Sequence, residues 1–137
     1  MKLFVDTNVL VSGLAFSGNE ALLLELGRMG VCELVVNEYV LDEVRHVLAR
    51  SHLGLEGSAQ RRAVAYLGRC ATAVGDPPLD AVRSVEGRLR DRRDLPILIG
   101  FELSGADHLV TGDRELQREV PRAITTRAAI DRVLFPD

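Results

Sequence analysis

The chain has 137 residues, of which 47% are hydrophobic, 27% are charged and 4% are aromatic, and it contains no tryptophan. These values are ordinary for a globular protein and predict one compact domain, residues 1–137, with a core of aliphatic side chains. The formal net charge of −3 argues against a protein that holds nucleic acid by overall charge alone, although local arginines could still contact phosphates.

The first part of the chain carries short apolar strands and an apolar helical stripe. We predict strands over Lys2 to Val5 and over Cys32 to Val36, and the second ends at Asn37, a favourable N-cap. We interpret the helical stripe between the strands as core and leave a surface role open; it consists of Leu22, Leu26 and Met29.

A helix is predicted from about Glu38 to Arg50. One apolar arc of this helix is formed by Val40, Leu41, Val44, Val47 and Leu48. A turn of about 100° per residue puts Glu43 on the border of the arc. Its carboxylate is therefore expected to look along the edge of the core toward a pocket.

Two further helices are predicted to pack against the core. Ser58 is expected to cap the first of them, whose apolar residues are Ala63, Val64, Leu67, Ala71 and Val74. The second follows Pro77 and Pro78, and its apolar residues are Leu79, Val82, Val85 and Leu89.

The last third of the chain continues the alternation. Asp94 precedes Leu95 and Pro96 and is expected to cap a helix that ends near Gly105. The remaining predicted elements are a strand over His108 to Thr111, a turn at Gly112-Asp113, a helix over Arg114 to Glu119, a strand over Ala123 to Thr125 and a helix over Thr126 to Leu134. This rhythm predicts an α/β fold in which a mainly parallel central sheet is covered by helices on both faces.

The chain is expected to stay in the cytoplasm. Its apolar runs are far shorter than the roughly 20 residues that a membrane span needs, and its first residues lack the apolar region of a signal peptide. Cys32 and Cys70 have no His or Cys neighbour at metal-ligand spacing. We therefore expect buried or neutral thiols rather than a zinc site or a disulfide framework.

Four acidic residues are predicted to share one pocket. Asp6 and Asp113 each follow the carboxyl end of a predicted strand, and open α/β sheets bind ligands in the crevice outside those ends. Asp94, at a helix start, and Glu43 could reach the same crevice. Two carboxylates about 4 Å apart repel by roughly 4 kcal/mol at an effective dielectric constant of about 20, so the cluster favours a divalent cation.

Carboxylates and water are the ligands that select Mg²⁺ or Mn²⁺. Such ions can support phosphodiester hydrolysis without a side-chain nucleophile. In agreement with that mechanism, the sequence has neither a Ser-His-Asp arrangement nor a glycine-rich phosphate loop, and its histidines lack metal-binding spacing.

Four segments resemble the PIN-domain family, specifically the prokaryotic toxins of toxin–antitoxin systems that are related to VapC-type ribonucleases. They are Phe4-Val5-Asp6-Thr7-Asn8, Val40-Leu41-Asp42-Glu43-Val44, Asp91-Arg92-Arg93-Asp94-Leu95-Pro96-Ile97-Leu98 and Gly105-Ala106-Asp107-His108-Leu109-Val110-Thr111-Gly112-Asp113. The order and spacing of these segments extend the resemblance over nearly the whole chain.

The resemblance implies a PIN-like three-layer α/β/α sandwich and Mg²⁺- or Mn²⁺-dependent cleavage of RNA. It also implies frequent homodimers and inhibition by a small antitoxin protein. By this resemblance, the metal-binding and catalytic residues are Asp6, Glu43, Asp94 and Asp113. The supporting residues are Asn8 and Thr111. The sequence departs from the family at Gly100-Phe101, where the family tends to have a small, alanine-rich helix face, and this affects packing more than chemistry.

Each acid also has a structural interpretation. Asp6 could form an Asx-turn, Asp94 and Asp113 could simply cap helices, and Glu43 alone could be a solvated helix acid. Capping and metal binding are compatible. We interpret Asp107 as a turn residue and Asp42 and Asp91 as solvated neighbours, although either of these two could be confused with the ligand that lies one or three positions away.

A basic stretch precedes Asp94 and could guide RNA toward it, although a solvated, charged helix face is the favoured interpretation; it consists of Arg83, Arg88, Arg90, Arg92 and Arg93. Two rival functions remain open. One is a PIN-like scaffold with weak or lost catalysis that acts through a protein partner, and the other is a structure-specific DNA nuclease.

Overall fold

A computed structural model describes the backbone of residues 1–137 and every side chain except that of Ser51. The strands are β1 (Lys2–Val5), β2 (Glu33–Asn37), β3 (Ala71–Val74), β4 (His108–Val110) and β5 (Ala123–Ile124). The α-helices are α1 (Thr7–Ala15), α2 (Asn19–Arg28), α3 (Glu38–Leu48), α4 (Gly57–Cys70), α5 (Leu79–Arg83), α6 (Leu95–Ser104), α7 (Arg114–Glu119) and α8 (Thr126–Leu134). Two short 3₁₀ helices are η1 (Ser51–Leu53) and η2 (Arg92–Asp94).

The five strands form one parallel sheet in the order β3-β2-β1-β4-β5. The chain builds the sheet from β1 outward through β2 to β3 and then returns to the other side of β1 with β4 and β5. Strand order therefore reverses between β1 and β4, and crevices at such a switch point are where open α/β sheets bind ligands. The predicted α/β fold with a parallel central sheet is confirmed.

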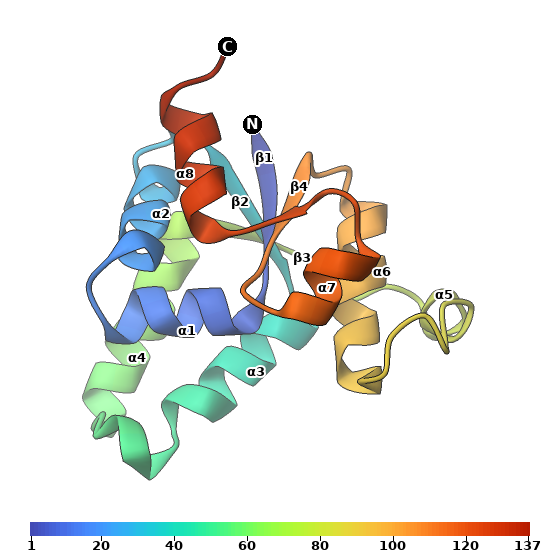
Figure 1. Cartoon of the computed structure of the whole chain (residues 1–137). Helices are drawn as coiled ribbons and strands as arrows, with labels where there is room; N and C mark the ends of the chain where they lie inside the picture. The colour runs from blue at the N-terminus through green and yellow to red at the C-terminus, as the bar shows by residue number, and fades with distance from the viewer.

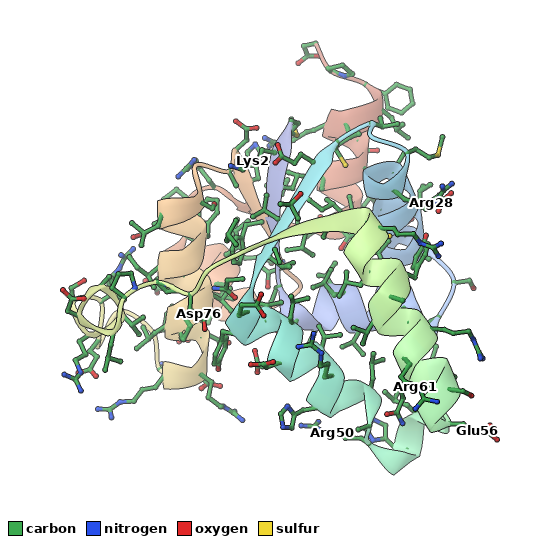
Figure 2. All side chains as sticks on the ribbon, turned by 180° about the vertical axis from the view of Figure 1, so that it is seen from behind. Lys2, Arg28, Arg50, Glu56, Arg61 and Asp76 are labelled. Atoms are coloured by element: carbon green, nitrogen blue, oxygen red, sulfur yellow. The ribbon has the colours of Figure 1, made fainter. Side chains whose placement is uncertain are left out.

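Helices cover both faces of the sheet. In Figure 1, α7 and α8 lie in front of the strands, whereas α4 comes to the front when the molecule is viewed from behind in Figure 2. Central strands that are covered on both faces read as continuous apolar runs. Accordingly, Leu3, Phe4 and Val5 of β1 are all fully buried, and Leu34, Val35 and Val36 of β2 are each only 1% exposed.

Side-chain caps fix the starts of several helices. Asn37 caps α3 by accepting a hydrogen bond from the N–H of Val40 (2.9 Å), and Thr125 caps α8 in the same way. Gly105 ends α6 with a φ of 72°, a left-handed conformation that glycine adopts without strain. These are the boundaries that the sequence predicted, because capping residues carry a local signal.

The segment after Glu56 differs from the prediction. Ser58 does not cap α4, since the helix begins at Gly57 and Glu56 occupies the N-cap position. The predicted helix also ends at Cys70, because residues 71–74 form the edge strand β3, which pairs with β2. Ala71 and Val74 fit the helical period of the preceding apolar residues, so the pattern alone continued the helix through the strand.

Two other helical predictions need correction. The helix after the prolines is limited to α5. Val85 and Leu89 are buried, but they belong to the irregular segment that follows this helix. In α2 the core face is formed by Leu23, Leu24 and Leu26. Leu22 and Met29 of the predicted core stripe are instead 42% and 61% exposed, so the core interpretation is wrong for them and correct for Leu26.

Helix α1 was not predicted, although it directly follows the first acidic residue of the site. No single helix in the described structure is long and apolar enough to cross a membrane. Helices α1 and α2 reach that length and hydropathy only as a pair, across a bend of 94°.

Gly100 explains the departure from the family pattern at Gly100-Phe101. A Cβ at this position would lie 2.6 Å from Nδ2 of Asn37 and 3.2 Å from Cζ of Phe4. The amide of Asn37 caps α3 and also donates to the carbonyl of Pro96 (3.2 Å), so it has little freedom to move. Glycine is therefore needed for the close packing of α6 against β1 and β2.

We expect Gly100→Ala to lower the free energy of unfolding by up to about 2 kcal/mol, because an overpacking cost of about 1–3 kcal/mol is offset by a gain of about 1 kcal/mol in helix propensity. Gly68→Ala is the matched control. It lies within α4 with nothing within 4 Å of the added Cβ, so it should stabilise the protein. Denaturant unfolding measures both variants, and an equal shift of the two in the same direction would contradict the packing argument.

Candidate functional site

Asp6 lies at the end of β1, in the middle of the sheet, and is only 5% exposed. Its Oδ1 accepts a hydrogen bond from the N–H of Thr7 (2.7 Å) at the start of α1, and its Oδ2 accepts one from the hydroxyl of Thr111 (2.7 Å). Burial raises the pKa of this carboxyl and the charge of Asp113 adds to the effect, while the two hydrogen bonds oppose it. The carboxylate is thus both a helix cap and a fixed, desolvated group.

Thr111 and Asp113 follow β4, the strand that pairs with β1, and this pairing brings them next to Asp6. The hydroxyl of Thr111 is fully buried between the two acids, since it donates to Asp6 and accepts from the N–H of Asp113 (3.0 Å). Asp113 caps α7 with Oδ1, which accepts from the N–H of Leu116 (2.9 Å). The capping interpretation of Asp113 therefore holds, and it occupies one carboxylate oxygen.

Glu43 lies on α3, one turn beyond the helix start, and is half-buried. Its Oε1 accepts a hydrogen bond from the hydroxyl of Thr7 (3.0 Å). Burial raises the pKa of Glu43 and the charge of Asp6 raises it further, against the hydrogen bond from Thr7 and the charge of Arg93. Glu43 is accordingly a partly desolvated acid at the border of the core rather than a solvated one.

Asp94 occupies the N-cap position of α6, but its side chain makes no capping hydrogen bond. Its backbone is helical (φ −87°, ψ −8°) because η2 leads directly into α6, whereas a capping residue is usually extended. The prediction that Asp94 occupies the N-cap position is thus correct, but the expected hydrogen bond from its side chain to the helix is absent. Burial, aided by the charges of Asp6, Asp91, Asp113 and Glu43, raises the pKa of Asp94 to about 7.

These four acids come from four separate elements and line one pocket of about 210 Å³ at the carboxyl edge of the sheet. The pocket is also lined by Thr7, Asn8, Val47, Arg50, Asp91, Arg93 and Ile97. A larger hollow of about 660 Å³ lies at the opposite edge, but it does not gather carboxylates in this way. The convergence expected from the sequence is therefore present.

The pocket is not a preformed chelate. Within the part of the chain that the structure describes, no three His, Cys, Asp or Glu side chains are arranged to hold a common metal ion. Mg²⁺ usually keeps several water ligands and takes only one or two carboxylates from the protein. The donor set of this pocket fits such a hard cation by its chemistry, because it consists of carboxylates and burial raises the pKa of three of them, Asp6, Glu43 and Asp94.

The secondary residues around the pocket differ in part from expectation. Asp91, interpreted as a solvated neighbour, lines the pocket and pairs with Arg93 (2.9 Å), whereas Asp42 is exposed and pairs with Arg45. Asp107 is a turn residue that accepts from the N–H of Lys2 at the other edge of the sheet. Asn8 lines the pocket as an exposed residue.

The sequence assigned no specific role to Thr7, although this residue stands in the first motif. Its N–H binds Asp6 and its hydroxyl binds Glu43, so it joins two of the acids. Arg50 was missed as well, because it lies seven residues beyond Glu43 and belongs to none of the motifs.

Comparisons with known proteins identify the family and support the fold. A family profile described as PIN domain matches residues 2–115. The crystal structure of PAE2754 from Pyrobaculum aerophilum is similar with a TM-score of 0.75 and 24% sequence identity, over 98% of this chain and 96% of that one, which supports the fold. No curated protein matches the sequence.

PIN domains are generally nucleases, hydrolases that act on nucleic acids, and they typically use divalent metal ions. The matched region contains all four acids of the pocket, from Asp6 to Asp113. By its sequence match and its fold, this chain belongs to the PIN-domain family.

Proposed function

We propose that the protein is a Mg²⁺- or Mn²⁺-dependent endoribonuclease in which Asp6, Glu43, Asp94 and Asp113 bind the metal and carry the reaction. One observation carries the proposal: carboxylates from four elements line one pocket at the switch point of the sheet, and three of them have raised pKa values. Burial is the main cause of these shifts and the neighbouring charges add to it, so a divalent cation would stabilise the ionised carboxylates.

The chain's own residues would divide the work. Thr111 and Thr7 hold both oxygens of Asp6 in place, so this acid is the fixed point of the site. Glu43 faces the pocket from α3 and would accept a proton from, or orient, the attacking water. When bound, a divalent cation lowers the pKa of water and neutralises charge on the scissile phosphate.

We further propose that the enzyme is the toxin of a toxin–antitoxin pair, inhibited by a small antitoxin protein and active as a homodimer. The resemblance of the four motifs to VapC-type ribonucleases supports this role. We expect the antitoxin to be encoded by a small reading frame directly upstream, with a DNA-binding pattern in its sequence. Its product should copurify with this chain.

A second candidate is a PIN-like scaffold that has weak catalysis and acts through a partner. It is favoured by the lack, among the described side chains, of three groups already placed to hold one ion. Calorimetric titration separates the candidates: the nuclease should bind Mn²⁺ with measurable affinity, and the scaffold should not.

The direct test is digestion of single-stranded RNA and of DNA flaps, side by side, in Mn²⁺, Mg²⁺ and excess EDTA. We expect cleavage of RNA with either metal and no cleavage in EDTA. Cleavage of DNA flaps alone would replace RNA by DNA as substrate, and cleavage that persists in EDTA would contradict the metal-dependent mechanism.

A further inference from the structure

Two arginines, Arg50 and Arg93, line the acidic pocket and approach it from different elements. Arg50 follows the end of α3, and Arg93 lies in η2, just before α6. A polyanion that enters a pocket lined by five carboxylates needs positive charge at the point of entry, and the protein as a whole supplies none, since its net charge is −3. These two arginines are therefore the candidates for contacts with substrate phosphates.

The guanidinium of Arg93 already forms an ion pair with Asp91. Its Nε and Nη2 donate to Oδ1 and Oδ2 of Asp91 at 3.1 Å and 2.9 Å, a bidentate pair, and its backbone N–H donates to the same carboxylate. Its carbonyl accepts from the hydroxyl of Tyr39 (2.7 Å). A phosphate that bound Arg93 would compete with Asp91 for the guanidinium, so Arg93 is the weaker anchor.

Arg50 forms no such ion pair with any side chain that the structure describes. Its backbone N–H donates to the carbonyl of Val47 (3.1 Å), while no hydrogen bond or ion pair of its guanidinium is found among the described side chains. The residue is exposed, and it lies at the α3 end of the molecule, far from Lys2 and Arg28 (Figure 2). The five donors of the guanidinium are therefore available to a planar or tetrahedral anion.

The spacing along α3 relates Arg50 to the acids. Arg50 lies seven residues beyond Glu43, which corresponds to about 10 Å along a helix. Both residues line the same pocket, Glu43 as a half-buried residue of α3 and Arg50 as an exposed residue beyond its end. A strand whose scissile phosphate lies between the acids would thus pass Arg50 with a neighbouring phosphate.

Arg50 could also have a purely structural role. A cation that follows a helix C-terminus interacts favourably with the helix dipole, and Arg50 stands in that position on α3. Such a role would stabilise the folded protein but would leave its affinity for RNA unchanged.

We propose that Arg50 is a substrate-binding residue that contacts a backbone phosphate of the RNA next to the scissile one. The inference rests on the proposed ribonuclease function. It adds a residue that lies outside the acidic motifs and that acts on binding rather than on the chemical step.

The test is the salt dependence of RNA binding. A short fluorescein-labelled single-stranded RNA is titrated with wild-type protein, Arg50→Gln, Arg50→Lys and Arg69→Gln in EDTA, and anisotropy gives the Kd at several salt concentrations. Arg69 is the matched control, because it is an exposed arginine that lines the hollow at the opposite edge of the sheet. Thermal unfolding of each variant checks that the fold is retained.

We expect Arg50→Gln to raise the Kd about tenfold and to reduce the slope of log K against log salt by about 0.7, the value for one lost phosphate contact on a single strand. Arg50→Lys should keep most of the slope, and Arg69→Gln should match the wild type. Equal slopes for Arg50→Gln and Arg69→Gln would overturn the inference while leaving the ribonuclease proposal intact. If the wild-type protein neither binds nor cleaves RNA, both fall.

Discussion

Replacing Asp6 with asparagine is expected to lower Mn²⁺-dependent RNA cleavage by more than about 100-fold, because a catalytic metal site contributes several kcal/mol of transition-state stabilisation and each 1.36 kcal/mol is about tenfold in rate. Asn keeps the shape of the side chain and one oxygen acceptor, so the cap of α1 should survive. The measurement is the initial rate of RNA cleavage under saturating Mn²⁺.

The same variant should be at least as stable as the wild type, although it is less active. Burial raises the pKa of Asp6 above its ordinary value of 3.8, which means that the folded protein binds the proton of this group more tightly than the unfolded chain does. At neutral pH the ionised carboxylate therefore costs folding free energy, and a neutral asparagine removes this cost. Its amide oxygen can still accept from the N–H of Thr7, while its NH₂ group can donate to the Thr111 hydroxyl, from which the carboxylate accepted. In EDTA we expect Asp6→Asn to unfold at a temperature equal to or above that of the wild type.

Asp42→Asn provides the matched control, since it makes the same charge change at an exposed residue that pairs with Arg45 and does not line the pocket. It should leave the cleavage rate within about twofold, in keeping with the small effects of exposed ion pairs. A variant Asp6→Asn that folds and still cleaves RNA at the wild-type rate would refute the assignment of Asp6.

The parts of the fold that the sequence predicted well are those with local signals. The segment from Asp113 to the C-terminus is an example, because side-chain caps at Asp113 and Thr125 mark the helix starts and short apolar runs mark the strands. The parallel sheet followed from the alternation of these elements. None of this required knowledge of long-range contacts.

The errors fall where long-range contacts decide the structure. Strand β3 is an edge strand of four small or β-branched residues, and only its pairing with β2 distinguishes it from the last turn of α4. The exposure of Leu22 and Met29 likewise depends on how α2 is rotated against its neighbours, since Leu23 and Leu24 offer an equally apolar face. Periodicity alone gives no basis for choosing between two such faces.

The four acids of the candidate site could be predicted from the sequence, but their hydrogen bonds and most other residues of the pocket could not. Asp6 and Asp113 follow parallel strands, whose carboxyl ends meet at one edge of the sheet, and Glu43 and Asp94 were expected to reach the same edge from helices. The sequence did not predict that Asp94 would lack a capping bond, which depends on the helical backbone imposed by η2. Nor did it predict that Thr7 would bridge Asp6 and Glu43, which depends on how α1 and α3 pack together.

Asp94 should make the metal-free protein less stable as the pH rises. Its pKa is about 7 in the folded protein and has the ordinary value of 3.8 in the unfolded chain. Between these values the folded state binds more protons, so the free energy of unfolding falls from about pH 4 to about pH 7 and then levels off. Because Asp94 is only half-buried, solvent screening limits the total loss to about 2 kcal/mol.

Asp94→Asn removes this titration. In EDTA, denaturant unfolding at pH 5 and pH 8 should show that the wild type loses about 1 kcal/mol more than the variant between the two pH values. The comparison is made between the two proteins at each pH, so that contributions from other titrating groups cancel. Parallel pH dependences for wild type and variant would contradict the raised pKa of Asp94.

Mn²⁺ should reverse the loss. A cation that binds the ionised carboxylates of the folded protein stabilises it, by about 2.7 kcal/mol at a concentration 100 times the Kd, and this effect is larger at pH 8 than at pH 5 because binding competes with protons. Asp94→Asn should gain less from Mn²⁺ than the wild type does, since it lacks one of the charges that the ion neutralises. Equal stabilisation of the two proteins at pH 8 would exclude Asp94 from the metal site, and this result does not depend on whether the protein cleaves RNA.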